Sequence, residues 1–133
     1  MPLTEQQLKD KALCRIDDSK VLYQNGRFEC ANYICGYAIE MALKHVICRT
    51  LNWDTFPPES IALNKLTSFK THDLKVLLSL SGIEQKVKRE LSVDWYVVMN
   101  WSPEQRYSTQ EINKVQASDM LESAENLVSN ILE

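Results

Sequence analysis

Glycine and proline are scarce in this chain, which has three glycines and four prolines among 133 residues. A β-sandwich needs many tight turns, and these two residues form such turns most readily. Long periodic stretches are instead dominated by Leu, Ala, Glu, Lys and Gln, which favour helices. The composition therefore indicates a helical protein, and the length suits one domain with a single core.

Long apolar runs are also missing, because no segment approaches the roughly 18 apolar residues that a membrane span needs. Residues 1–11 are too polar to form the core of a signal peptide. We therefore expect a cytoplasmic protein that has no membrane partner.

Cysteine pairs typical of metal sites are absent, since the four cysteines form no Cys-x-x-Cys motif. His45 lies three residues before one of them on the same predicted helix, but nothing obvious supplies the further two ligands that zinc takes. We therefore expect neither a metal nor a cofactor, and no disulfide framework. Free, buried thiols are expected at all four positions, which are Cys14, Cys30, Cys35 and Cys48.

Positive charge is in deficit, because the formal net charge is −3. This balance excludes a broadly basic clamp for DNA, so any contact with nucleic acid must come from a local patch. The densest basic cluster, Lys86, Lys88 and Arg89, is interleaved with acidic residues and is typical of a solvated helix face. It would become a binding candidate only if a further cation joined it in space: Arg106, Lys70 or Lys75.

The periodic stretches predict an all-α, up-and-down helical bundle of about five to six helices, folded as one domain over residues 1–133. Asn25-Gly26 provides a left-handed stop after the first helix, and Pro57-Pro58 cannot lie inside a helix. The expected helices occupy residues 4–24, 27–51, 59–68, 72–82, 83–101 and 108 to near the C-terminus.

Three details of these helices depend on particular residues. Thr71 or His72 is expected to cap the helix that ends at Gly82. The Ser-x-x-Glu pattern from Ser108 to Glu111 predicts a capping box at the start of the last helix. In the second half of the helix over 83–101, apolar residues occur on more than one side, which a dimer interface and a central place in the bundle explain equally well: Val93, Tyr96, Val97 and Met99.

The segment from residue 31 to residue 44 is the most informative part of the chain. Its small residues Ala31, Ala38 and Ala42 lie on one helical face, so a neighbouring helix could approach closely. Glu40 and Lys44 are four residues apart and are expected to pair on the surface of that helix.

Two later segments, residues 71–74 and 101–107, read Thr-His-Asp-Leu and Trp-Ser-Pro-Glu-Gln-Arg-Tyr. Together with the segment 31–44 they resemble the HEPN domain (higher eukaryotes and prokaryotes nucleotide-binding), whose members carry an A-x-E-x-x-L-K-like helix, an H-D-L helix start and an R-Y element. The resemblance implies a helical bundle that dimerises through bundle helices and binds a nucleotide or RNA. It also implies partnership with a minimal nucleotidyltransferase in a toxin–antitoxin-like pair. The matched residues, spread over about half of the chain, are Ala38, Glu40, Leu43, Lys44, His72, Asp73, Leu74, Arg106 and Tyr107.

The resemblance also assigns metal-independent RNA cleavage to an arginine that is followed four to six residues later by a histidine. Here those positions after Arg106 hold Gln110, Glu111 and Ile112. Cleavage needs a group that transfers a proton near neutral pH, and glutamine cannot do so. We therefore expect ribonuclease activity to be absent or very weak. The open alternative is a metal-independent endoribonuclease that uses Arg106 with His72 or Glu111.

Arg106 is the main candidate for binding a ligand. It precedes a predicted helix N-terminus, where a guanidinium and free backbone N–H groups can together hold a phosphate. The alternative is an ion pair with Glu40 or Asp73 that locks the bundle. Tyr107 either stacks on a base or packs in its loop. The candidate ligand-binding residues are Arg106, Tyr107, Asp73, His72, Lys44 and Glu40.

A third interpretation is a protein-interaction module that binds no small ligand. Under this interpretation the apolar residues between Val93 and Met99 form the surface for the partner.

Overall fold

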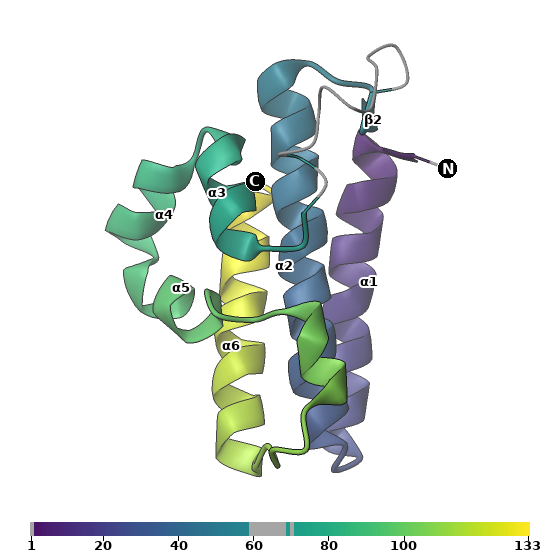
Figure 1. Ribbon diagram of the computed structural model, residues 1–133, viewed down its shortest axis with the longest axis vertical. Coiled ribbons are helices and arrows are strands. Elements are labelled where there is room, and N and C mark those ends of the chain that lie inside the picture. The colour runs from purple at the N-terminus through teal and green to yellow at the C-terminus, as the bar shows by residue number, and fades with distance from the viewer. Residues whose placement is uncertain (1, 59–68, 70) are drawn as a thin grey trace.

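The computed structural model describes residues 2–58, 69 and 71–133. Within these residues the chain is an all-α helical bundle, which confirms the predicted fold class (Figure 1). The body consists of three long helices, α1 (Glu5–Gln24), α2 (Phe28–Leu51) and α6 (Lys114–Ile131). Beside it lie the shorter helices α3 (Leu74–Ser81), α4 (Glu84–Glu90) and α5 (Ser92–Val98), followed by the 3-10 helix η2 (Pro103–Tyr107).

Two very short strands tie the start of α1 to the chain that follows α2. Strand β1 (Leu3–Thr4) pairs antiparallel with β2 (Thr55–Phe56), so that Leu3 lies opposite Phe56. In the part of the chain that the structure describes, none of the helices combines the length and the apolar character that crossing a membrane requires.

Helices α1 and α2 form the antiparallel hairpin that the sequence predicts, with bounds that differ from the expected ones by one residue. A reciprocal capping box begins α1: the Thr4 hydroxyl accepts from the Gln7 N–H at 3.1 Å, and the Gln7 side chain accepts from the Thr4 N–H at 3.0 Å. The turn between the helices contains Gly26 at a φ of 76°, a conformation that glycine adopts without strain.

Helix α2 lies at the centre of the bundle and packs against α1, α3 and α6. Its small residues Ala31, Ala38 and Ala42 are fully buried, which confirms that neighbouring elements approach them closely. Cys35 and Cys48 are buried thiols, as expected.

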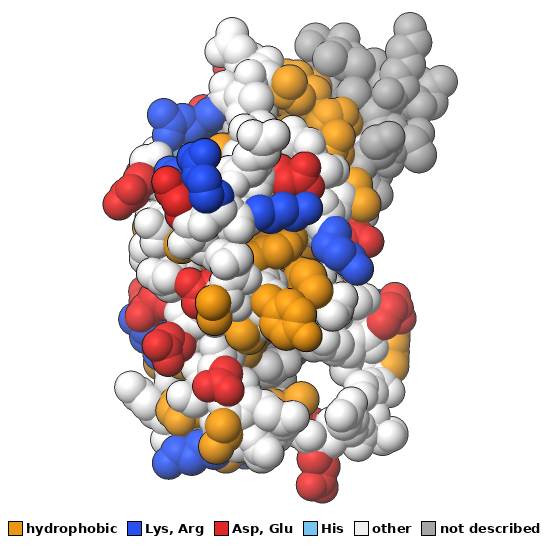
Figure 2. All heavy atoms as spheres, turned by 90° about the vertical axis from the view of Figure 1, so that its left-hand side faces the viewer, with side chains coloured by type: hydrophobic (Ala, Val, Ile, Leu, Met, Phe, Trp, Pro, Cys, Tyr) orange, Lys and Arg blue, Asp and Glu red, His pale blue; other side chains and the backbone are white. Residues whose placement is uncertain are grey.

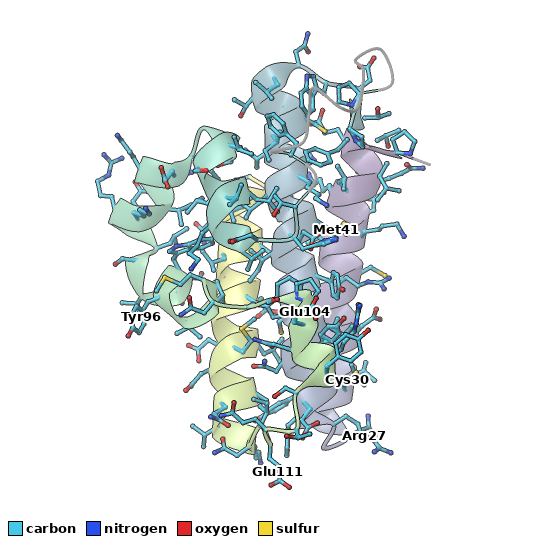
Figure 3. The ribbon with its side chains drawn as sticks, viewed as in Figure 1. Arg27, Cys30, Met41, Tyr96, Glu104 and Glu111 are labelled. Carbon is cyan, nitrogen blue, oxygen red and sulfur yellow. The ribbon has the colours of Figure 1, made fainter. Side chains whose placement is uncertain are left out.

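The expectation of buried thiols is wrong for Cys14 and Cys30, which are exposed. Cys14 lies two residues from each of the buried residues Ala12 and Ile16, and a step of two residues turns a helical side chain away from that face. Figure 3 shows Cys30 on the outside of the bundle, near the start of α2.

The single helix predicted over 83–101 is wrong, because the chain forms α4 and α5 with a break at Leu91 (φ −129°, ψ 29°). The apolar residues there recur every four residues from Ile83 to Trp95, and each such step advances around a straight helix by about 40°. A continuous helix would therefore turn the later apolar residues of this series away from the core. The break instead lets Val87 and Trp95 both be buried.

The central position considered for the second half of this segment is also wrong. Val93 and Tyr96 are 77% and 74% exposed, and Val97 is exposed as well, whereas Met99 is partly buried. Val93, Tyr96 and Val97 therefore form an apolar face on the outside of α5.

Two predicted helix starts differ from the observed ones. Asp73 caps α3 by accepting from the Lys75 N–H at 2.9 Å, while Thr71 accepts from the Asp73 N–H and His72 turns towards α2. Helix α6 begins after Asn113 rather than Ser108. A box of the same type forms there, because Asn113 and Gln116 each accept from the other's backbone N–H. The helix predicted over 59–68 lies outside the described residues.

We predict that the cap at Asn113 contributes measurably to stability and that Ser108 does not. Asn113→Ala should lower the free energy of unfolding by about 1 kcal/mol, because the Gln116 N–H in the first turn of α6 loses its acceptor. Ser108→Ala should change it by less than about 0.5 kcal/mol, since Ser108 only accepts from the Gln110 N–H in an exposed loop. Urea unfolding followed by circular dichroism measures both, and equal losses would contradict the assignment.

Candidate functional site

A buried carboxylate lies in the middle of α2. The Glu40 side chain is 1% exposed, and it accepts hydrogen bonds from Lys44 Nζ at 2.8 Å and from His72 Nδ1 at 2.9 and 3.0 Å. The expected pair of Glu40 and Lys44 therefore forms, but inside the protein rather than on its surface. Because a buried ionised carboxylate is costly unless donors surround it, both partners are needed to hold it there.

The bond to Glu40 fixes the orientation of the His72 ring. An ionised carboxylate only accepts hydrogen bonds, so Nδ1 carries the hydrogen and Nε2 is left for other partners. The His72 side chain is 59% exposed, so this second nitrogen is accessible.

A groove of about 410 Å³ opens beside His72, and we call it the Arg106 groove. Its walls come from α2, from the start of α3 and from the segment that leads into η2, and Figure 1 shows where these elements run. Its lining residues are Tyr37, His72, Asp73, Lys75, Met99, Asn100, Trp101, Ser102, Pro103, Glu104 and Arg106.

The groove brings together some of the residues predicted from the sequence and leaves others out. His72, Asp73 and Arg106 line it, and Glu40 lies behind His72. Tyr107 and Glu111 are not among its lining residues. Figure 3 shows Glu104 in front of the middle of α2 and Glu111 at the lower end of the bundle. Of the two acid–base partners considered for Arg106, the geometry therefore retains only His72.

Trp101 attaches this segment to α2. Its indole N–H donates to the Tyr33 carbonyl at 3.0 Å, and the side chain is 4% exposed. The ring lies directly on Gly36, where a Cβ atom would come within 1.9 Å of Trp101 Cε2. Glycine is thus required at position 36 for the contact that holds Arg106 near the groove.

Sequence reasoning missed three residues of this arrangement, Tyr33, Gly36 and Tyr37. The Tyr33 and Tyr37 hydroxyls are 3.0 Å apart, and the Tyr37 ring packs edge-on against Trp101 with centroids 4.9 Å apart. A signal was present, because a glycine in the interior of a helix usually marks a close approach of another element.

Arg106 is exposed and stays cationic. Its guanidinium lies over the Tyr107 ring, with the central carbon 4.8 Å from the ring centroid. The phenol oxygens of Tyr107 and then of Tyr33 raise the pKa of Arg106 above its usual value. Tyr107 is itself 70% exposed, so it does not pack in its loop.

The ion pair considered for Arg106 is not formed. Glu40 binds Lys44 and His72, and Asp73 accepts from the Lys75 N–H at the start of α3. Across residues 2–58, 69 and 71–133, Arg106 makes no ion pair with a carboxylate. Its charge is therefore available to an anion from outside.

Further charges of both signs surround the groove. Lys75 lines it with Arg106 and donates to the Asn100 side chain at 3.4 Å, whereas Asp73 and Glu104 contribute negative charge. The basic cluster on α4 does not extend this site, because Lys86 lines a different groove. Lys70, the other cation considered, lies outside the described residues.

Metal ligands do not gather at this site. Within the described ranges, no group of three or more His, Cys, Asp or Glu side chains is arranged to hold a metal ion.

Comparison with known proteins found no matching family model, curated protein or solved structure. The resemblance to the HEPN domain accordingly stays a prediction. The site itself offers an exposed cation, an oriented imidazole and an aromatic wall.

The tyrosine pair gives a prediction for alkaline pH. Its hydrogen bond to Tyr33, and then burial, raise the pKa of Tyr37 to about 12. The ordinary pKa of tyrosine is about 10, so the folded state holds this proton more tightly than the unfolded state does. The resulting stability is present below about pH 10 and is lost as the pH rises through about 12. Tyr37→Phe should reduce that loss in urea unfolding measured across this pH range, and an unchanged loss would contradict the role of Tyr37.

Proposed function

We propose that the protein binds the phosphate group of a nucleotide or of RNA in the Arg106 groove. One observation carries the proposal: Arg106 is an exposed cation that no described carboxylate neutralises, at the edge of a groove that also presents Lys75 and His72. Guanidinium groups bind phosphate through two parallel hydrogen bonds. The volume of about 410 Å³ lies within the range of small-molecule sites.

The resemblance to the HEPN domain supports this proposal independently. The three segments that carry the resemblance come from α2, from the start of α3 and from η2, and residues of all three meet at or behind the groove. Under the same resemblance, the protein works with a minimal nucleotidyltransferase as its toxin–antitoxin-like partner. The cytoplasmic location expected from the sequence is part of this proposal.

Replacement of Arg106 tests the binding site. A nucleotide or short RNA at about 100 times its Kd should stabilise the native protein by roughly 2.7 kcal/mol. Arg106→Ala should abolish that stabilisation, because the remaining cations lie beside Asp73 and Glu104. A thermal-shift panel of nucleotides and a short RNA measures the effect. Arg89→Ala is the matched control, since Arg89 is a 75% exposed arginine on α4.

Two outcomes of this panel would contradict the proposal. The first is the absence of any shift with every nucleotide and with the RNA. The second is a shift that Arg106→Ala and Arg89→Ala weaken equally, because this would indicate a general charge effect.

A second candidate function is metal-independent cleavage of RNA by Arg106 and His72. It is favoured by the bond from His72 to Glu40, because a carboxylate on one ring nitrogen orients the other for proton transfer. The same RNA incubated with EDTA distinguishes the two functions. Cleavage that is lost in both His72→Gln and Arg106→Ala would favour the enzyme, and intact RNA would favour binding alone.

The proposal includes a homodimer formed through the apolar face of α5. Val93, Tyr96 and Val97 are exposed there, and Figure 2 shows apolar side chains gathered in the middle of this side of the molecule. Figure 3 shows Tyr96 pointing outwards from α5. A second copy would remove these side chains from water, which is the usual reason for an exposed apolar patch.

We predict that Val97→Asp weakens self-association. A carboxylate at this position would have to be buried in the dimer, so the dissociation constant should rise by about tenfold or more. Light scattering after size-exclusion chromatography measures the oligomeric state. Val115→Asp is the control, since Val115 is 68% exposed and lies on α6 rather than on α5. A protein that is monomeric before any substitution would contradict the dimer. Association without any ligand-induced shift would favour the interaction module.

A further inference from the structure

A second groove lies where the last turns of α2 and α6 meet α4, and we call it the α4 groove. Its volume is about 340 Å³. The floor is apolar, because Val46, Val87 and Ile131 lie along it and are almost completely buried. It shares no lining residue with the Arg106 groove.

The rim of the α4 groove carries charges of both signs. Arg49 from α2 and Lys86 from α4 are cationic, whereas Glu133 is anionic. Figure 2 shows Lys and Arg side chains next to Asp and Glu side chains over the upper part of this face. The two cations face a site with an apolar base, so a ligand with one carboxylate and an apolar body would complement them.

The two cations differ in how far they are already neutralised. Arg49 Nε lies 3.6 Å from Glu5 Oε1, so its charge is partly shared. Within the described part of the chain, Lys86 makes no ion pair, whereas its neighbour Lys88 pairs with Glu84 at 3.2 Å. Lys86 would therefore stabilise a bound carboxylate more than Arg49 would.

The negative side of the groove suits an ammonium group. Glu133 supplies a carboxylate, and Asn130 and Ile131 from the last turn of α6 line the groove with it. The C-terminal end of a helix carries a partial negative charge that favours a cation. A ligand that carries a carboxylate alone would leave this side without a partner.

We propose that the α4 groove binds a free α-amino acid with an apolar side chain, such as leucine. The carboxylate pairs with Lys86 and Arg49, the ammonium group pairs with Glu133, and the side chain lies on Val46, Val87 and Ile131. The volume of about 340 Å³ is at the small end of ligand sites, as befits a single amino acid. This site is separate from the phosphate site proposed above and does not depend on it.

The test is a titration of the full 15N-labelled chain with leucine, followed by NMR. Amide signals of Thr50, Val87 and Ile131 should shift and saturate, because these residues line the groove. Lys86→Met should weaken leucine binding by about tenfold, since one charge-assisted hydrogen bond is lost. Lys88→Met is the matched control, because Lys88 lies on the same helix but does not line the groove.

Two analogues separate the charged contacts. Isocaproate is leucine without its ammonium group, and isoamylamine is leucine without its carboxylate. Both should bind more weakly than leucine. Glu133→Gln should weaken leucine binding but leave isocaproate binding unchanged, and Lys86→Met should leave isoamylamine binding unchanged, because each variant removes only the partner of the missing group.

Several outcomes would overturn the proposal. Absence of leucine-dependent shifts at the groove would do so, as would equal effects of Lys86→Met and Lys88→Met. Isocaproate binding as tightly as leucine would show a plain carboxylate site instead. The Arg106→Ala variant should bind leucine as tightly as the unchanged protein does. Loss of phosphate binding and loss of leucine binding are therefore measured separately.

Discussion

The ionised side chain of Glu40, buried in α2, is the constraint on which the candidate site depends. Burying one charge costs several kcal/mol unless its partners come with it. One partner, Lys44, is on the same helix, and its ammonium group lies 5.2 Å from the centre of the Phe56 ring in β2. The other, His72, is 32 positions away in sequence. The carboxylate thus holds the start of α3 against α2, and its partner Lys44 lies over the end of β2.

A second contact of α2 extends this arrangement to Arg106. Gly36 lies one helical turn before Glu40 and receives the Trp101 ring, which fixes the segment leading into η2. Tyr33 and Tyr37 flank this contact, and Lys44 follows Glu40 by another turn. These positions recur at spacings of three and four, so they share one face of α2. The candidate site is therefore one stripe of a helix that is buried along much of its length.

Local signals in the sequence predicted the hairpin of α1 and α2, because Thr4, Gly26 and the apolar period act within a few residues of each other. The contact between Glu40 and His72 could not be predicted in the same way. Locally, Glu40 is explained as a surface partner of Lys44, and His72 as the cap of the helix that follows it. Only tertiary packing decides whether they keep these local roles or bind each other. The stripe from Tyr33 to Lys44 was present in the sequence, but its spacing alone does not show which segment covers it.

Competition between similar local signals explains the errors at helix ends. Ser108 to Glu111 and Asn113 to Gln116 both fit a capping box, and the chain uses the one that directly precedes Ala117, the first buried residue of α6. Likewise, the apolar period from Ile83 to Trp95 fits a helix, but its steps of four residues cannot face one core without a break. In both cases the local helix propensities are equal for the two alternatives, and the burial of apolar side chains decides which one forms.

Helix α3 is held to α2 at both ends, which gives the two grooves a fixed relation. At its start, His72 binds Glu40 beside the Arg106 groove. At its end, the Thr50 hydroxyl donates to the Ser81 carbonyl at 2.7 Å, and Gly82 turns the chain into α4 with a φ of 84°. Thr50 also lines the α4 groove. Because each groove takes a wall from α2 and another from a segment adjoining α3, both are present in the chain without a ligand. The binding proposed for each would therefore need little rearrangement of the backbone.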